Sequence, residues 1–211
     1  AIVKLDNAVA VVADNYWVAQ KYLDQLSISW SETANSSVSS DRLYEQFSTD
    51  IDTAISSKQL ESDIEEGDAA QAISQSTEVI EAVYKVPFLA HACMEPMNAT
   101  VSINDGGCQI WTGTQNPLGL RNDVAKALEL EPHQVKVNQH FMGGGFGRRA
   151  FTDFAVQAAL IAKQVKQPIK VLWSRPEDIQ HDLYRPAVVS KFRASLDDTC
   201  LLYTSPSPRD S

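Results

Sequence analysis

Alternating apolar and polar positions along much of the chain predict short β-strands, because successive side chains of a strand point to opposite faces. Strands are predicted at residues 1–5, 7–13, 27–30, 77–88, 101–112, 133–140, 169–174 and 187–196. Apolar residues at helical spacing lie between several of these strands. They predict helices at about residues 15–26, 41–55, 124–130 and 150–165, with a loop or helical turn at 176–186. The mixture predicts an α+β fold.

Turn and cap residues suggest where these elements begin and end. The Asp6-Asn7 pair is expected to form the turn of a first hairpin. Gly106-Gly107 would supply positive φ in the turn of a second hairpin. Helix N-caps are expected at Asp14 or Asn15, at Ser40, and at Asn122 or Asp123. Apart from the helix at 41–55, residues 31–78 are rich in Ser, Asp and Glu and are expected to form an exposed connection with a boundary near Ser76.

Charge is distributed unevenly along the chain. The 211 residues carry 18 Lys and Arg against 27 Asp and Glu, a formal net charge of -9. Residues 1–80 have a net charge of -10 and residues 81–211 one of +1. This asymmetry predicts a domain boundary at residue 80, with an acidic linker before it. An acidic chain is not expected to bind nucleic acid, and no apolar run reaches the roughly 20 residues of a membrane span.

The two ends of the chain differ from the pattern between them. The chain opens directly in a strand-like pattern, without Met and without the features of a signal peptide, so we expect a processed or truncated chain. Residues 199–211 break off after a predicted strand, contain two prolines and have no partner element. They are expected to be a non-native tail.

Residues 141–149, FMGGGFGRR, lie between a predicted strand and a predicted helix. They match neither the dinucleotide fingerprint, because Arg148 replaces the third glycine, nor a P-loop, which needs GK[ST]. Four glycines let the backbone approach a ligand and present N–H groups to an anion, beside the N-terminus of the following helix. Arg148 and Arg149 add forked donors. The alternative, a flexible surface loop, is disfavoured by Phe141 and Phe146.

Two further segments carry polar side chains. Gln115, in WTGTQNP, can donate its amide to an oxo or carbonyl oxygen, although these residues also fit a polar turn. His91, Cys93 and Glu95 would share a face only in an extended segment, and no fourth ligand has a recognisable spacing. Structural roles are therefore expected for them rather than a metal site. The three cysteines of the chain are expected to be reduced thiols, and no GxSxG supports a Ser–His–Asp triad.

In this order, the segments resemble the molybdenum-binding large subunit of the xanthine dehydrogenase/aldehyde oxidase family, and most closely its isoquinoline 1-oxidoreductase β-subunit type. The matching text is FLAHACMEPMNATVSI, QIWTGTQNP, the stretch from HFMGGGFGRR to DLYRPA, and AVAVVADNYWVAQKYLDQLSISW. The resemblance covers residues 1–198. It implies the remnant of a small α/β-hammerhead-type domain at 1–80 and the first part of the α+β molybdopterin-binding domain at 81–198.

The resemblance also implies a cofactor, a molybdopterin dinucleotide in the cytosine form. Gln115 matches the glutamine that hydrogen-bonds the apical oxo group of the molybdenum. The loop that lies against the molybdenum centre is matched by Gly144, Gly145, Phe146 and Gly147, with Arg148 expected near cofactor phosphates or oxo groups. The 2Fe-2S clusters are expected on a partner small subunit, with cytochrome c as a candidate electron acceptor.

The implied reaction is hydroxylation of an aldehyde or an N-heteroaromatic such as isoquinoline, with water as the oxygen source. Purine-oxidising members of the family carry a glutamate three residues after the last loop glycine. Ala150 stands there, which counts against xanthine. The catalytic glutamate of the family lies far downstream, so this chain is expected to hold no catalytic residue and to be inactive as a fragment.

Two other functions stay open from the residues themselves. One is a non-catalytic α+β module whose glycine loop binds a phosphate or a carboxylate. The other is a nucleotide-dependent dehydrogenase, which Arg148 disfavours. Large subunits of the resembling branch often carry an export signal, so the periplasm is expected, with the cytoplasm as the alternative.

Overall fold

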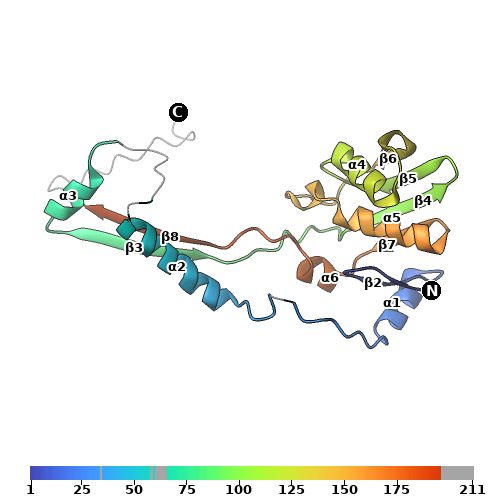
Figure 1. The fold of residues 1–211 in the computed structure, drawn as a ribbon, viewed down its shortest axis with the longest axis horizontal. Coiled ribbons are helices and arrows are strands. Elements are labelled where there is room, and N and C mark those ends of the chain that lie inside the picture. The colour runs from blue at the N-terminus through green and yellow to red at the C-terminus, as the bar shows by residue number, and fades with distance from the viewer. Residues whose placement is uncertain (34, 58, 60–65, 196–211) are drawn as a thin grey trace. The chain divides into compact units, whose positions relative to one another are not determined.

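The computed structural model describes residues 1–33, 35–57, 59 and 66–195 of the chain. Two compact units form, and each is built from segments that are distant in sequence (Figure 1). The first contains residues 1–31 and 89–185, and the second contains the described residues of 32–88 and 186–195. The α+β class is confirmed, while the domain boundary expected at residue 80 stays a prediction. The expected tail at 199–211 lies outside the described residues.

A four-stranded sheet forms the centre of the first unit, in the order β6-β5-β4-β7. Its strands are β4 (Asn98–Asn104), β5 (Gly107–Thr112), β6 (Val135–Gln139) and β7 (Ile169–Leu172). The β4–β5 and β4–β7 pairs are antiparallel, whereas β5 and β6 run parallel. This mixed order brings the ends of β5, β6 and β7 and the start of β4 to the same edge of the sheet.

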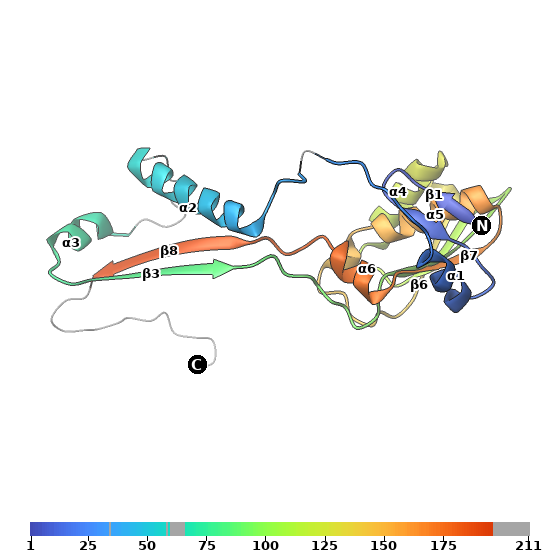
Figure 2. The ribbon, with the colours of Figure 1, turned by 90° about the horizontal axis from the view of Figure 1, so that it is seen from below.

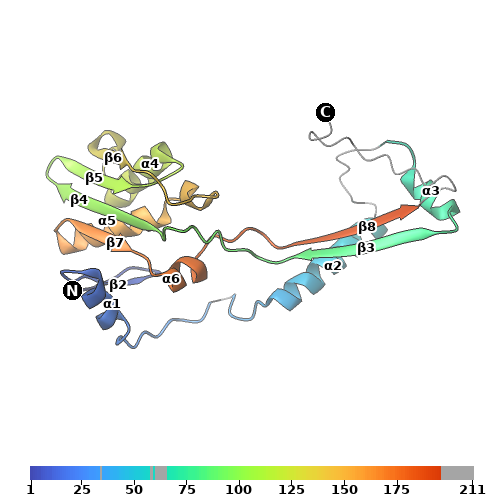
Figure 3. The ribbon, with the colours of Figure 1, turned by 180° about the vertical axis from the view of Figure 1, so that it is seen from behind.

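Two helices, α4 (Pro117–Leu128) and α5 (Asp153–Val165), pack against each other and cover one face of this sheet (Figure 3). Four alanines of α5 are buried, at positions 155, 158, 159 and 162. Such small side chains let the helix lie close to Val101 of β4 and Ile110 of β5 in the hydrophobic core. The predicted helix at 150–165 is therefore confirmed, with its first turn three residues later than expected.

The start of α4 and the turn of the second hairpin differ from the sequence prediction. Asn116, not Asn122 or Asp123, caps α4 by accepting a hydrogen bond from Gly119, and Pro117 occupies the first helical position. In the hairpin only Gly107 of the two glycines has positive φ, 127°. A Cβ at Gly107 would lie 2.1 Å from the carbonyl oxygen of Gln134, so the backbone approach itself requires glycine.

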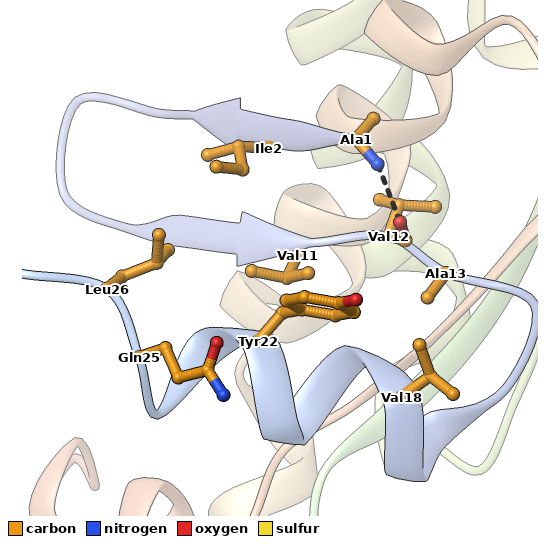
Figure 4. Close-up of a pocket in the computed structure, with 9 residues that line it drawn as sticks. All are labelled: Ala1, Ile2, Val11, Val12, Ala13, Val18, Tyr22, Gln25 and Leu26. Atoms are coloured by element: carbon orange, nitrogen blue, oxygen red, sulfur yellow. Dashed lines mark hydrogen bonds between the residues drawn. The ribbon is translucent and has the colours of Figure 1, made fainter.

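The first hairpin, β1 (Ile2–Lys4) with β2 (Val9–Val11), is confirmed and is followed by α1 (Tyr16–Leu23), which Asn15 caps. Val3 belongs to the same core as the sheet and helices. A pocket of about 430 Å³ separates β2 from α1, and its lining includes Val11 and Tyr22 (Figure 4). Residues 27–30 form no strand, contrary to prediction.

The second unit contains a long antiparallel ribbon of β3 (Val79–Val86) and β8 (Val188–Ser195) (Figure 2). Both strands were predicted from the sequence, but their pairing was not. Helices α2 (Ser40–Ser57) and α3 (Ala69–Gln75) contact β8. Ser39 rather than Ser40 accepts the capping hydrogen bond of α2, from Arg42. The sequence did not predict α3, which falls in the segment expected to be an exposed connection.

A further helix of the first unit, α6 (Arg175–Gln180), follows β7, and two short 3-10 turns, η1 (Pro132–Gln134) and η2 (Arg148–Ala150), complete the described elements. Among the described residues, no helix combines the length and the apolar character that crossing a bilayer requires.

Candidate functional site

Three segments that the sequence singles out meet at one edge of the four-stranded sheet. The segment 91–97 leads into β4, residues 113–116 follow β5, and residues 140–149 follow β6. Because β5 and β6 are parallel and β4 runs against β5, these three connections must emerge on the same side. The segment after β7 joins them there, since Leu172 pairs with Asn98.

Residues 91–95 run antiparallel to the glycine loop, which we define as residues 143–147. Glu95 exchanges two hydrogen bonds with Gly143: its backbone N–H donates to the Gly143 carbonyl, and its Oε2 accepts from the Gly143 N–H at 2.8 Å. Two residues earlier, the Cys93 thiol donates to the Gly145 carbonyl. His91 lies opposite Gly147, where a Cβ would be 3.7 Å from its Nε2. The segment is bent rather than extended, because Ala92 has φ 46°, yet all three side chains lie against the glycine loop.

The glycine loop itself bends through residues that adopt positive φ. Gly144 has φ 98°, Phe146 51° and Gly147 97°, and Arg148 N–H donates to the Gly145 carbonyl to close a tight turn. Within the described part of the chain, the N–H groups of Gly144, Gly145 and Phe146 have no hydrogen-bond acceptor. The turn therefore presents several backbone donors, the arrangement that binds anionic or strongly accepting oxygens.

Gln115 is fixed against the glycine loop by two hydrogen bonds. Its backbone N–H donates to the Arg149 carbonyl at 2.9 Å, and its side-chain Oε1 accepts from the Gly147 N–H at 3.1 Å. The second bond identifies Oε1 as the oxygen, because only an acceptor can satisfy that N–H. In the described chain the Gln115 amide nitrogen has no acceptor and remains available to a ligand. A Cβ at Gly145 would lie 2.7 Å from Oε1, so a side chain there would displace the Gln115 amide.

Arg149 connects the three segments from within the protein. Its side chain is fully buried. The guanidinium donates to the carbonyls of Gly144, Gly113 and Glu95, and its Nη2 lies 3.1 Å from Glu95 Oε2. One planar group therefore links the segment before β4, the end of β5 and the glycine loop.

Glu95 is partly exposed, and its ionisation is perturbed by these contacts. Partial burial acts to raise the pKa of the Glu95 carboxyl, but hydrogen bonds from Gly143 and Asn98 and the nearby Arg149 charge outweigh it. The net effect lowers the pKa below its ordinary value. The carboxylate is thus held in its charged form as a fixed acceptor at the start of the glycine loop.

Arg148 belongs to a second buried network. Its guanidinium forms two 2.8 Å hydrogen bonds with Asp153, at the first residue of α5. Its Nε lies 2.9 Å from Asp182 Oδ1, an ion pair without hydrogen-bond alignment. Asp182 also accepts from His91, through both its backbone N–H and its ring Nδ1, and the Trp173 ring lies 5.5 Å from Arg148. Burial alone would lower the pKa of Arg148, but Asp153 and Asp182 raise it.

Both arginines therefore direct their donors into the protein, whereas the sequence suggested that they face a ligand. Asp153, in the first turn of α5, places a negative charge at this helix N-terminus and binds Arg148 there. A direct contact between Arg148 and a cofactor stays a prediction. Neutral donors remain for a ligand: the amide of Gln115 and the unpaired N–H groups of the glycine loop. Among the described residues, no group of three or more His, Cys, Asp and Glu side chains could hold a metal ion.

Sequence reasoning missed the structural partners of this site. Structural roles were expected for His91 and Glu95 but without partners, and Asp182, Asp153 and Thr114 were not considered. Thr114 donates from its hydroxyl to the Arg149 carbonyl at 3.0 Å. The alternation of His91, Cys93 and Glu95 was the available signal, since it fits an extended segment lying along another backbone.

An α+β domain whose glycine loop and flanking glutamine present neutral donors at a sheet edge has the features of a domain that binds an anionic cofactor. The sequence profile of the molybdopterin cofactor-binding domain matches residues 52–202, more than half of the chain. The chain therefore belongs to this family, and molybdopterin is its class of cofactor.

Its relatives include subunits of molybdenum enzymes. The aldehyde oxidoreductase molybdenum-binding subunit PaoC of Escherichia coli O157:H7 is 35% identical over 63% of this chain and 18% of its own length. Isoquinoline 1-oxidoreductase subunit beta of Brevundimonas diminuta is 32% identical over 54% of this chain and 14% of its own length. The nicotinate dehydrogenase large molybdopterin subunit of Eubacterium barkeri is 32% identical, with coverages of 81% and 40%. The chain thus spans less than half of each relative.

The fold is also similar to that of solved structures. The aldehyde oxidoreductase from Desulfovibrio desulfuricans ATCC 27774 aligns with 62% of this chain and 15% of its own length, with a TM-score of 0.51 and 19% identity. At this identity the likeness shows the fold alone.

Proposed function

We propose that the chain is part of the large subunit of a molybdenum hydroxylase and that its glycine loop, with Gln115, holds the molybdenum end of the cofactor. The observation that carries the proposal is the Gln115–Gly147 hydrogen bond. It fixes the Gln115 side chain with its amide nitrogen unpaired within the described chain, beside unpaired N–H groups of the loop. The absence of Cβ atoms at Gly144 and Gly145 leaves the backbone accessible.

These donors suit the cofactor because they are neutral. When bound, a molybdopterin cofactor supplies the two-electron redox chemistry of its molybdenum. An amide and peptide N–H groups can bind oxo and phosphate oxygens without changing protonation during a reaction cycle. Glu95, Arg149 and Arg148 hold the backbone that carries these donors, so the donors are in place before a ligand arrives.

The proposed reaction of the intact protein is the oxidation of an aldehyde or an N-heteroaromatic substrate, with water as the oxygen source. The names of the relatives, which include an aldehyde oxidoreductase and an isoquinoline 1-oxidoreductase, support this range. Ala150 follows the loop where purine-oxidising enzymes carry a glutamate, which supports the exclusion of xanthine. The cytosine dinucleotide form, a partner subunit with 2Fe-2S clusters, cytochrome c as acceptor and periplasmic localisation belong to the same proposal.

The experiment is to express the complete gene together with its neighbouring iron–sulfur open reading frame. Metal analysis measures molybdenum, and mass spectrometry measures pterin and the cytidine monophosphate released from the cofactor. Turnover is then compared for an aldehyde, isoquinoline and xanthine. A folded protein that contains neither molybdenum nor pterin would refute the proposal and would favour an anion-binding module.

The role of Gln115 has its own test. Gln115→Ala removes the amide donor and should lower turnover about 10-fold to 100-fold, while molybdenum and pterin content change little. Gln109→Ala is the matched control, because Gln109 lies in the middle of β5, away from the loop edge. Unchanged turnover in a fully loaded Gln115→Ala protein would remove this residue from the site.

A further inference from the structure

His91 differs from the two side chains that follow it along the glycine loop. Glu95 and Cys93 both form hydrogen bonds with the loop backbone, at Gly143 and Gly145. The ring of His91 lies beside Gly147 but forms no hydrogen bond with it, because the Gly147 N–H donates to Gln115. Its side chain is only 7% exposed.

Asp182 fixes the orientation of the His91 ring. The Asp182 carboxylate lies 3.0 and 3.1 Å from Nδ1, and it also accepts the backbone N–H of His91. Arg148 anchors the same carboxylate from the other side, at 2.9 Å from Nε. A carboxylate accepts a hydrogen bond from the ring N–H at Nδ1, so a neutral imidazole in this orientation carries its lone pair on Nε2. Nε2 is therefore the ring nitrogen left over, and within the described residues it has no hydrogen-bond partner.

We propose that Nε2 of His91 is a hydrogen-bond acceptor for the ligand that the glycine loop binds, receiving an N–H or O–H group of a molybdopterin-class cofactor. This inference rests on the proposed function. Its basis is a buried, oriented imidazole nitrogen, unpaired within the described residues, beside the same Gly147 that donates to Gln115. The amide of Gln115 and the imidazole of His91 would then both contact the ligand beside this glycine.

Two substitutions separate a ligand contact from a purely structural role. His91→Asn retains a polar atom at the position of Nδ1, so it can keep the bond to Asp182, but it has nothing at Nε2. His91→Gln places an amide near the position of Nε2 and gives up the bond to Asp182. A ligand contact predicts that the Gln variant retains the cofactor better, whereas a structural role through Asp182 predicts the reverse.

The measurement uses the complete enzyme, assembled with its partner subunit. Bound pterin and molybdenum are followed during dialysis, and the melting temperature of each apoprotein is recorded. We expect His91→Asn to release pterin about tenfold faster than the wild type at an unchanged melting temperature, the loss expected for one buried hydrogen bond. His91→Gln should release it within about twofold of the wild-type rate.

Equal release from both variants, faster release from the Gln variant, or losses that follow the melting temperature would overturn the inference. If His91→Gln does not fold, the Asn variant alone decides, because it must release pterin faster without a change in melting temperature. Failure of the proposed function looks different: the wild-type enzyme would then contain no molybdenum or pterin at all.

Discussion

Replacement of Arg149 by methionine tests whether one buried guanidinium holds the site together. Methionine has a similar length and fills much of the same space, but it donates no hydrogen bond. The substitution removes the donor from the carbonyls of Gly144, Gly113 and Glu95 and leaves the Glu95 carboxylate without its cation. The segment before β4, the end of β5 and the glycine loop would therefore lose the group that links them.

The magnitude follows from these contacts. Breaking a buried ion pair by removing one partner costs about 3–5 kcal/mol. Glu95 is 40% exposed, so water compensates part of that loss and moves it toward the lower end. The Gly113 carbonyl is buried and would lose a donor, which adds about 1–3 kcal/mol. We expect a total loss of about 4 kcal/mol, a large share of the roughly 5–15 kcal/mol typical of a folded protein.

The free energy of unfolding is measured by urea denaturation, and hydrogen exchange is followed in the peptide covering residues 141–149. Arg193→Met is the matched control. Arg193 pairs with Glu81 on the exposed ribbon, with both side chains more than half exposed, so its loss should stay below about 1 kcal/mol. A loss below about 1 kcal/mol for Arg149→Met, or unchanged exchange in the glycine loop, would refute the reasoning.

Three further predictions follow from the same structure. Gly107→Ala should destabilise the chain by more than about 2 kcal/mol, because its Cβ would meet the Gln134 backbone at positive φ. Gly106→Ala, where the nearest atom is 3.3 Å away, should cost under about 1 kcal/mol in the same urea titration. Because the pKa of Glu95 lies below its ordinary value of 4.5, the charged carboxylate stabilises the fold at pH values above 4.5. That stability is lost as the pH falls through the lowered pKa. Glu95→Gln should therefore lose less stability on acidification than the wild type, and parallel pH curves would contradict this. Burial raises the pKa of Cys108 to about 11, so iodoacetamide at pH 8 should label it only after unfolding, as peptide mapping would reveal.

Local patterns predicted most of the strands and the long helices because their signals lie within each segment. The hairpins, the β3 and β8 strands and α5 were identified in this way. The strand expected at residues 27–30 failed because alternation does not ensure a partner strand, and none pairs with it among the described residues. The start of α4 was not predicted because Gly119, a poor helix former, lies in its first turn. The Asn116-Pro117 pair is nevertheless typical of a helix start.

The residues of the candidate site could be predicted from the sequence, but the hydrogen bonds and ion pairs between them could not. Gln115 and the glycine loop were both predicted, and the structure places them in hydrogen-bond contact. Two adjacent arginines in the sequence do not predict that Arg148 and Arg149 point into the protein, because their acidic partners are distant in sequence. Asp182 lies 34 residues after Arg148, and Glu95 lies 54 residues before Arg149. Charge patterns describe neighbours in the chain, whereas these pairs depend on how four strands meet at one edge.

The adjacent arginines Arg148 and Arg149 restrict which insertions and deletions this segment can accept during evolution. Their side chains diverge from neighbouring backbone positions, one to Asp153 and Asp182 and the other to Glu95. Deleting either arginine would leave one guanidinium for carboxylates in two separate networks, and deleting another residue between Gly147 and α5 would shift both arginines relative to Asp153. Insertions and deletions should therefore be absent from this stretch in functional homologues, even where individual loop side chains vary.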